Sequence, residues 1–529
     1  MATTPLPSFT TGPGMDCPGK SSRKSTRRFS EETEPPGRMT VFTFSETTDP
    51  AIVAGVGRTR QEQVDMATLN AKYQPYPAYK SSGIEWLGDI PAHWEVRRLK
   101  TLATVQLSNV DKKSEEGQAV VGLCNYVDVY YNERIRSDVD FMVATASEDQ
   151  IRRFSLHKGD VLVTKDSESW TDIAVSAVVS ENFPDVLCGY HLAHIRPGGH
   201  CDGAFLSRAF SATGPGNQYE TAANGITRFG LTGDAIREGV FPVPPLKEQR
   251  AIADFLDRET ARIDALVAKK ERLIELLQEK RTALITRAVT RGLDPDVPMK
   301  DSGVEWLGEI PAHWEVKRLK HLVGKVGSGK TPKGGAERYV DDGVMLLRSQ
   351  NVHFGGLRLT DVAYIDGDTD DEMAGSRVLE GDVLLNITGA SLGRSCVAKL
   401  SGKDANVNQH VCIIRPNQQQ DEPKFLAYSI ESRPLQDQIF NNENGVSRDA
   451  LNFEQIGDLV FARPSKNEQQ AIAASLERET AKLDSLVAKI REAIERLREL
   501  RSALISAAVT GRIDVREEAE ATVFDVKRK

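Results

Sequence analysis

The chain has 529 residues, of which 40% are hydrophobic and 27% are charged, and its formal net charge is -8. This length exceeds the size at which one hydrophobic core stops growing, so a single small domain is excluded and two or more domains are expected. The acidic balance gives no support to free, non-specific binding of nucleic acid, which needs clustered Lys and Arg.

The sequence also excludes membrane insertion and secretion. No apolar run approaches the roughly 20 residues that span a bilayer, and the polar N-terminus lacks the apolar core of a secretory signal. We therefore expect a cytoplasmic protein. The six cysteines include no C-x-x-C pair, which argues against a structural zinc or a disulfide framework and predicts reduced core residues: Cys17, Cys124, Cys188, Cys201, Cys396 and Cys412.

The N-terminal residues 1–75 differ in composition from the rest. The first 65 are rich in Pro, Gly, Ser and Thr, and they hold a basic cluster between Lys20 and Arg28. Such a composition is typical of a disordered extension. The alternative is a basic tail that contacts DNA.

An internal repeat organises the remainder. Lys80–Lys100 recurs as Lys300–Lys320, with 17 of 21 positions identical, and a second matching pair begins at Glu248 and Glu468. Both pairs are displaced by 220 residues, so the chain is a tandem duplication. Between these anchors the copies differ greatly, which predicts one scaffold that carries two different surfaces.

Each copy opens with a module that leans towards β-structure, at 76–245 and at 296–463. Short runs of Val, Ile, Leu and Tyr are broken there by Gly, Asn and Asp, as in Val161–Thr164 and Val383–Ile387. These modules are expected to be mixed, β-rich globular domains.

A long helix follows each module, at 246–295 and at 464–515, before a tail at 516–529. Apolar residues recur every seven positions at Leu256, Ile263, Leu277, Leu284, Leu476, Leu483, Ile490, Leu497 and Leu504. A second row contains Leu266, Leu273 and Lys280 in the first copy and Leu486, Ala493, Leu500 and Ala507 in the second. Heptads sustained this far predict a coiled coil, in which the two copies of the helix pair antiparallel. The alternative is that each helix packs on its own module or on another subunit.

The second helix also carries a start signal. Ser465 and Glu468 have the spacing of a capping box, and about 40 residues of helix make a rod roughly 60 Å long. The predicted fold class is therefore α+β, with two globular domains that are joined and spaced by an antiparallel coiled coil in a pseudo-two-fold repeat.

The motifs that flank the modules resemble a known family. W-L-G-x-I-P-x-H-W-x-V occurs at Trp86–Val96 and at Trp306–Val316, and P-P-L-x-E-Q-x-x-I-A occurs at Pro244–Ala253, with a degenerate copy at Pro464–Ala473. The segment from about 75 to 515 resembles the DNA-specificity (S) subunits of type I restriction-modification enzymes, both in its motifs and in the order of those motifs. Met66 resembles a natural start for this family, in which case the residues before it would not be translated.

The resemblance implies a function without catalysis. Each module would be a target-recognition domain that reads one half of a bipartite, asymmetric site on double-stranded DNA, and the helices would fix the spacing. The subunit would dock two DNA-methyltransferase (M) subunits, which modify N6 of adenine, and then endonuclease/translocase (R) subunits. S-adenosylmethionine, ATP and Mg²⁺ are expected on those partners, and no cofactor or metal on this chain.

Two other functions remain open at this point. Gly324–Thr331 satisfies G-x-x-x-x-G-K-[ST], the phosphate-binding P-loop of NTPases. The residues that follow, Pro332 to Gly335, make a poor start for the helix that such a loop needs. The second alternative is a purely structural coiled-coil scaffold, which would assemble partners without choosing a sequence.

Base reading needs polar, basic and aromatic residues on loops where the copies differ. The candidates in the first module are Asn125, Tyr126, Tyr130, Tyr131, Arg134, Arg136, Lys165, Ser167 and Trp170. Those in the second are Arg348, Ser349, Gln350, Asn351, His353, Arg358, Thr388, Ser391 and Arg394. For each one, the alternative is a solvated loop residue.

Contacts to the DNA backbone are expected from other positions. Thr227 and Arg228 are matched by Ser447 and Arg448, which suits backbone positioning, although a helix-capping role is equally open. Lys330 and Lys333 are candidates for phosphate contacts. His191 and His410 match as well, and we expect them to be structural. Neither module has an excess of Lys and Arg, so the methyltransferase subunits are expected to supply much of the grip.

Overall fold

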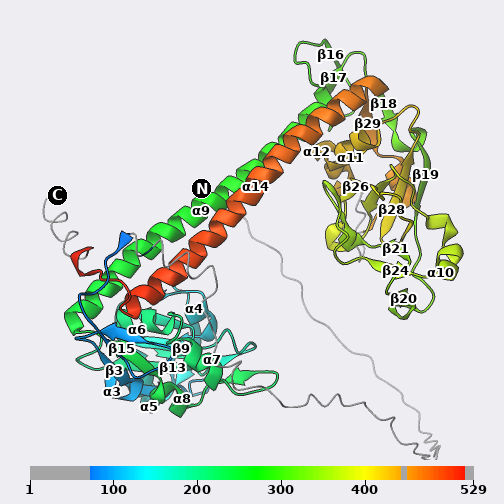
Figure 1. The fold of residues 1–529 in the computed structure, drawn as a ribbon. Coiled ribbons are helices and arrows are strands. Elements are labelled where there is room, and N and C mark those ends of the chain that lie inside the picture. The colour runs from blue at the N-terminus through cyan, green and yellow to red at the C-terminus, as the bar shows by residue number, and fades with distance from the viewer. Residues whose placement is uncertain (1–68, 70–71, 442–449, 519–529) are drawn as a thin grey trace, which may run out of the picture. The chain divides into compact units, whose positions relative to one another are not determined.

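The computed structural model describes residues 69, 72–441 and 450–518 (Figure 1). Most of the predicted N-terminal extension, Ser447, Arg448 and the end of the C-terminal tail lie outside the described residues. Within them, no helix is long and apolar enough to cross a membrane. The five cysteines in this part, Cys124 to Cys412, are free and buried, as the composition predicts.

The first module contains two main sheets. One has the strand order β4-β13-β9-β11-β6 and the other the order β7-β5-β12-β8. The strands of the first sheet are Ala103–Leu107, Leu192–Pro197, Val161–Thr164, Ser176–Val179 and Arg134–Ile135. Those of the second are Met142–Ala146, Ala119–Cys124, Phe183–Cys188 and Ser155–Leu156.

Smaller elements complete this module. The two-stranded pairs are β1 (Tyr79–Ser81) with β2 (Asp89–Pro91), β3 (Glu95–Arg98) with β15 (Val240–Val243), and β10 (Asp166–Ser167) with β14 (Phe229–Gly230). The helices are α3 (Leu99–Leu102), α4 (Tyr126–Tyr130), α5 (Glu148–Phe154), α6 (Gly203–Phe210), α7 (Asn217–Ala222) and α8 (Gly233–Glu238).

The second module repeats this plan with different loops. Its sheets have the orders β19-β28-β25-β26 and β20-β24-β21-β27. The strands are Val323–Ser328, Val411–Pro416, Val383–Asn386 and Ser395–Val397 in the first, and Tyr339–Val340, Ala363–Ile365, Val344–Leu347 and Ala405–Val407 in the second. The pairs are β16 (Met299–Asp301) with β17 (Glu309–Pro311), β18 (Glu315–Arg318) with β29 (Val460–Arg463), and β22 (Val352–His353) with β23 (Gly356–Leu357).

Helices are short in this module. They are α10 (Gly367–Glu372), α11 (Pro423–Glu431), α12 (Arg433–Asn441) and α13 (Phe453–Gly457). Single 3₁₀ turns occur at η1 (Leu319–His321), η2 (Gly335–Arg338), η3 (Ser349–Asn351), η4 (Ala374–Ser376) and η5 (Gly389–Ser391).

The central strands show why these sequences form buried sheets. Successive side chains of a strand point to opposite faces, and those of β9 enter two different cores. Val161 and Val163 pack with the helical side of the module, whereas Leu162 packs in the core of the second sheet. Val383 and Leu384 of β25 divide in the same way. A continuous apolar run is therefore required, since both faces are covered.

The two long helices are α9 (Leu246–Arg291) and α14 (Lys466–Val509), which lie side by side (Figure 1). Their polar contacts show an antiparallel pair. Arg501 Nε lies 2.9 Å from Asp264 Oδ1, and Arg281 Nε lies 3.5 Å from Asp484 Oδ1. Arg281 lies 220 positions before Arg501, and Asp264 lies 220 positions before Asp484, so the two ion pairs are equivalent in the repeat. A pseudo-two-fold axis therefore relates the helices. The predicted fold class is confirmed.

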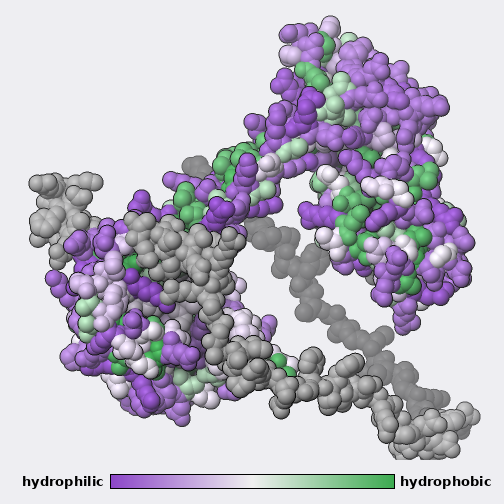
Figure 2. All heavy atoms as spheres, viewed as in Figure 1, coloured by the Kyte–Doolittle hydropathy of each residue, from purple (hydrophilic) through white to green (hydrophobic). Residues whose placement is uncertain are grey.

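The heptad prediction is only partly right. Leu256, Ile263, Leu277, Leu476, Ile490 and Leu504 are buried, and Leu284, Leu483 and Leu497 are half-buried. The second row is only partly covered: Leu266, Leu273 and Leu486 are 43–44% exposed, whereas Leu500 is half-buried and Ala507 is buried. Figure 2 shows hydrophobic residues on the surface of the helix pair.

The helix ends explain the difference. The start of α9 and the end of α14 share the core of the first module, and the end of α9 and the start of α14 share a core with the second. Leu256 and Leu476 therefore bury against the modules. A seam between the helices alone is confined to a small cluster around Leu277, Ile490 and Ile494. The alternative in which each helix packs on its own module holds only for the helix starts, because the end of each helix packs on the other module.

The family motifs meet at the two helix starts. Glu248 accepts hydrogen bonds from Trp94 Nε1 at 3.0 Å and from His93 Nε2 at 2.8 Å. Glu468 contacts Trp314 and His313 in the same way, both at 3.0 Å. The predicted capping box is therefore half formed: Ser465 Oγ accepts from the Glu468 amide, but the Glu468 carboxylate binds the tryptophan and the histidine instead.

Candidate nucleic-acid interface

The P-loop pattern at Gly324–Thr331 does not have the geometry of a nucleotide site. Its first residues form β19, which is an edge strand of an antiparallel sheet. Pro332 follows, and the next helical element is the four-residue 3₁₀ turn η2. Gly329 is explained by packing, since a Cβ there would lie 1.5 Å from the Val407 carbonyl oxygen. The phosphates would meet no helix N-terminus, so the NTPase alternative is not favoured.

In the first module, loops from several strands converge at one edge of the sheets. Leu192 pairs with Thr164, which brings the residues before β13 beside those after β9. Cys188 pairs with Cys124 in a parallel register, so β12 and β5 end together. Asn125, Lys165 and the segment 189–191 therefore reach the same edge, and the β10–β14 pair places 224–230 next to them.

A histidine and an aspartate lie at the centre of this edge. His191 Nδ1 is 2.8 Å from Asp166 Oδ2, and Lys165 Nζ is also 2.8 Å from that oxygen. Burial would raise the pKa of Asp166, but the hydrogen bonds from Lys165 and His191 hold it below its ordinary value. A carboxylate only accepts, so His191 Nδ1 carries a proton and its Nε2 remains as the second polar atom of the ring. The Arg228 guanidinium lies beside this histidine, with Arg228 Nη2 3.4 Å from His191 Nδ1.

Aromatic side chains surround this pair. The Lys165 ammonium lies 4.7 Å from the centroid of the Tyr190 ring, and Tyr126 stacks on Tyr130 with centroids 5.5 Å apart. The Tyr130 hydroxyl donates to Asp172, which, together with burial, raises the pKa of Tyr130 to about 12. Tyr131 is 79% exposed. A hollow of about 390 Å³ opens here, lined by Asn125, Tyr126, Tyr190, His191 and neighbours that include Lys112.

The second module has a corresponding edge with different chemistry. Val411 pairs with Asn386, so His410, which precedes β28, lies beside the residues after β25. His410 Nδ1 is 2.7 Å from Thr388 Oγ1. Gln409 donates to His410 Nε2 at 3.0 Å and accepts from the Thr331 hydroxyl at 2.6 Å. The histidine is thus matched between the modules, whereas an acidic partner in the first is replaced by a hydroxyl in the second.

The other predicted residues divide by accessibility. Arg136, Trp170, Thr227, Lys330, Lys333, Gln350, Arg358 and Arg394 are exposed. Arg348, Ser349, His353 and Ser391 are half-buried. Ser167 and Asn351 are buried, and the Asn351 amide donates to the carbonyl oxygens of Arg358 and Asp361, so it shapes the loop from inside. Arg134 forms an ion pair with Asp257 of α9 and is committed to the contact between module and helix.

Several residues of these edges were absent from the predicted reading set. They are Lys112, Tyr190 and Gln409, with His191 and His410 expected only as structural residues. A signal was present in the sequence, because a histidine that recurs just before a strand in both copies marks equivalent positions. Tyr190 and Gln409 precede the two histidines and differ between the copies. No group of three or more His, Cys, Asp or Glu is placed to hold a metal ion within the described ranges.

Comparison with known proteins agrees with this architecture. The family model described as the type I restriction modification DNA specificity domain matches residues 91–276 and again residues 311–496. The chain belongs to this family. The two matches are displaced by 220 residues, the same offset that relates the copies of the repeat. Each match extends from the first motif of a module through most of the helix that follows it.

Individual relatives of the specificity domain are distant. The type I restriction enzyme EcoBI specificity subunit of Escherichia coli is 27% identical over 304 residues, which cover 55% of this chain and 62% of the relative. The type I restriction enzyme MjaVIII specificity subunit of Methanocaldococcus jannaschii is 24% identical over 278 residues, covering 52% and 62%. The chain therefore spans less than two thirds of the length of these relatives.

Among solved structures, a chain from a study of complex assembly and conformational transition of the type I R-M system superposes with a TM-score of 0.62. It is 16% identical, and the match covers 80% of this chain and 99% of that one. At this identity the likeness concerns the fold, which is shared over both modules and both helices.

Proposed function

We propose that this chain is the DNA-specificity subunit of a type I restriction-modification complex, and that it has no catalytic activity of its own. The observation that carries the proposal is the pair of specificity domains at a constant offset, mounted on helices that matched ion pairs hold antiparallel. Pseudo-two-fold symmetry in the protein suits the two-fold relation of the strands of a duplex. Each module, 76–245 and 296–463, then reads one half of a bipartite site, and the helices at 246–295 and 464–515 set the separation.

The reading surfaces are the two strand-end edges. In the first module, Tyr126, Lys165, Tyr190 and His191 lie around one hollow. Basic and aromatic side chains that converge at one edge suit contacts with phosphates and bases. In the second module, Gln409, His410 and Thr388 form the equivalent edge. The partner of His191 is the acidic Asp166, whereas the partner of His410 is the neutral Thr388. The two halves of the recognised site are therefore expected to differ too.

Exposed residues around these edges extend the proposed contact. Lys330, Lys333 and Arg228 suit phosphate binding, which positions the module without reading sequence. The other exposed candidates, which include Arg136, Trp170, Gln350, Arg358 and Arg394, suit contacts at the rim. Ser167 and Asn351 act behind the surface, where they hold the loops, and Arg134 holds the first module against α9.

The partners belong to the proposal as well. A net charge of -8 makes tight DNA binding by this chain alone unfavourable, so two DNA-methyltransferase subunits supply part of the grip, and endonuclease/translocase subunits join that assembly. S-adenosylmethionine, ATP and Mg²⁺ are bound by those subunits. The complex methylates N6 of adenine and works in the cytoplasm, where it meets DNA.

Exchange of one module tests the proposal. Residues 300–463 are replaced by the corresponding module of another family member, and methylated sites are mapped across the genome of cells that also express the methyltransferase subunits. We expect one half of the bipartite motif to change while the other half stays the same. An unchanged motif would refute DNA reading by this module and would support the purely structural scaffold instead.

A further inference from the structure

Two arginines stand where each long helix meets the other helix and a recognition domain. Arg281 of α9 and Arg501 of α14 are 220 residues apart, so they are equivalent in the repeat. Arg501 pairs with Asp264 of α9 and also with Glu133 of the first domain. Arg281 pairs with Asp484 of α14 and also with Glu431 of the second domain. Each arginine thus joins three parts of the chain.

The arginines are shielded from solvent at these junctions, whereas most of their acidic partners are exposed. The Arg281 and Arg501 side chains are 15% and 22% exposed, and Glu431 is 10% exposed, but Glu133, Asp264 and Asp484 are 48%, 54% and 60% exposed. Burial alone would lower the pKa of Arg501, but its hydrogen bonds to Glu133 and Asp264 raise that pKa overall. A guanidinium is planar, and its N–H donors lie along more than one edge of that plane, so one arginine can bind a helix and a domain at the same time.

The glutamates come from unrelated places in the two domains. Glu133 lies between α4 and β6, whereas Glu431 is the last residue of α11. At the offset of 220, the counterpart of Glu431 is Ser211, which has no carboxylate. Two domains with different loops therefore supply an acid to the same position of the helix pair. The shared element is the arginine.

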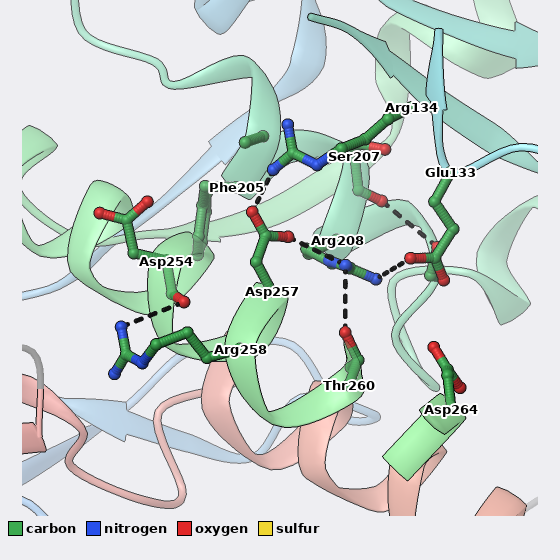
Figure 3. Close-up of polar contacts among 12 residues, drawn as sticks. Glu133, Arg134, Phe205, Ser207, Arg208, Asp254, Asp257, Arg258, Thr260 and Asp264 are labelled. Carbon is green, nitrogen blue, oxygen red and sulfur yellow. Dashed lines mark hydrogen bonds and ion pairs between the residues drawn. The ribbon is translucent and has the colours of Figure 1, made fainter. Parts of the chain in front are cut away.

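In the first domain, this junction continues into a polar network centred on the buried Arg208 (Figure 3). Arg208 donates to Glu133 at 2.7 Å, to Asp257 at 3.0 Å and to Thr260 at 3.3 Å. Asp257 also pairs with Arg134. Glu133 thus bridges Arg208 and Arg501, and the domain is attached to α9 and α14 at once. Burial would raise the pKa of Glu133, but the two arginines hold it below its ordinary value.

The second domain uses other side chains at the equivalent places. Tyr428 occupies the position of Arg208, and its hydroxyl lies 3.4 Å from Thr480, the counterpart of Thr260. Glu477 replaces Asp257 and pairs with Lys424 at 2.6 Å. The contacts differ in detail, but both domains keep the junction arginine. They also keep a second matched contact with the opposite helix, because the Thr213 amide donates to Ser506 Oγ and the Arg433 amide donates to Thr286 Oγ1.

We propose that Arg281 and Arg501 are positioning residues that hold each recognition domain in register with the helix pair, and thereby set which half-site separation the complex accepts. This inference rests on the proposed function. A slip of one helix turn moves the helices by about 5.4 Å, and successive base pairs are about 3.4 Å apart. A single slip therefore exceeds one base-pair step, and it would break both junctions together.

The test uses the full chain in complex with its methyltransferase subunits. The wild-type site is first mapped, and duplexes are then made with the spacer between half-sites shortened, kept or lengthened by one base pair. The spacer ratio is the methylation rate on a duplex with an altered spacer divided by the rate on the duplex with the native spacer. We expect Arg501→Ala and Arg281→Ala each to raise this ratio about ten-fold, which corresponds to about 1.4 kcal/mol, while the half-site bases stay unchanged.

Milder variants and a matched control keep the test informative. Arg501→Lys keeps the charge but loses the forked guanidinium donors. Glu431→Gln removes only the charged contact on the domain side, whereas Glu133→Gln also removes the charged contact to Arg208. All three should raise the ratio. Arg498→Ala is the control, because Arg498 pairs with Glu271 of the other helix and with Glu495 of its own, and with no recognition-domain residue among those that the structure describes. It should leave the ratio unchanged.

The outcomes separate the two proposals. If the junction variants lower the melting temperature but keep the wild-type spacer ratio, as Arg498→Ala does, the arginines are merely structural and the inference is overturned. If the wild-type complex methylates sites without a two-part motif, the proposed function fails instead. A relaxed spacer in the junction variants alone supports the inference.

Discussion

Removing the carboxylate of Glu248 should loosen the first module more than the equivalent change loosens the second. In Glu248→Ala, the Trp94 indole N–H loses its acceptor while the ring remains fully buried. An unsatisfied buried donor costs about 1–3 kcal/mol, and a hydrogen bond to a charged group contributes about 1.5–3 kcal/mol. The Glu248 side chain is only 7% exposed, so we expect a loss of about 3 kcal/mol.

Glu468→Ala is the internal comparison. Glu468 makes the same two contacts, but its side chain is 29% exposed, so water replaces part of what is lost. We expect about 1–2 kcal/mol there. Glu248→Gln, which keeps one acceptor oxygen for Trp94, should fall between the wild type and the alanine variant.

Urea unfolding followed by tryptophan fluorescence measures both effects, because Trp94 and Trp314 are buried in different modules. A chain with several domains need not unfold in one step, so the shift is assigned to the transition that reports the affected tryptophan. Equal shifts for Glu248→Ala and Glu468→Ala, or no shift for either, would refute the argument from burial.

Three further predictions concern the first module and the reading edges. Arg208→Met should cost about 2–3 kcal/mol in urea unfolding, since it leaves Asp257 and Glu133 without their shared cation. The exposed Arg262→Met should cost less than about 0.5 kcal/mol. Burial would raise the pKa of Asp160, but hydrogen bonds from Arg196 and His194 hold it well below its ordinary value. Its stabilisation is therefore present above the ordinary carboxyl pKa and lost as the pH falls through the lowered one, so Asp160→Asn should destabilise at pH 7 and less at pH 3, by urea midpoint. His191→Ala should relax one half of the methylated motif and His410→Ala the other, by genome-wide mapping; relaxation of both halves by either variant would contradict separate reading.

The motifs that carry the family resemblance turn out to be structural. His93 and Trp94 belong to the first motif and Glu248 to the second, and they meet at the start of α9. Their role is to attach the opening of a module to its helix. This explains why the same motif residues recur in both copies while the residues at the strand-end edges of the two modules differ.

The duplication, the two modules, the two long helices and the family can all be read from the order of the amino acids. Those features are local or repetitive: identity at a constant offset is read directly, and the heptad period reflects helix geometry. Even the error in the second heptad row has a plain cause, since the period does not say whether a partner helix or a module covers each stripe.

Which side chains share a surface depends on how the chain folds. His191 and Asp166 are 25 residues apart and meet because β9 and β13 are neighbours in the sheet. Arg134 was an equal candidate for DNA contact until the fold placed it against Asp257. Loop residues have no periodicity, and the partner of a charged group depends on which distant segments the sheets and helices bring together.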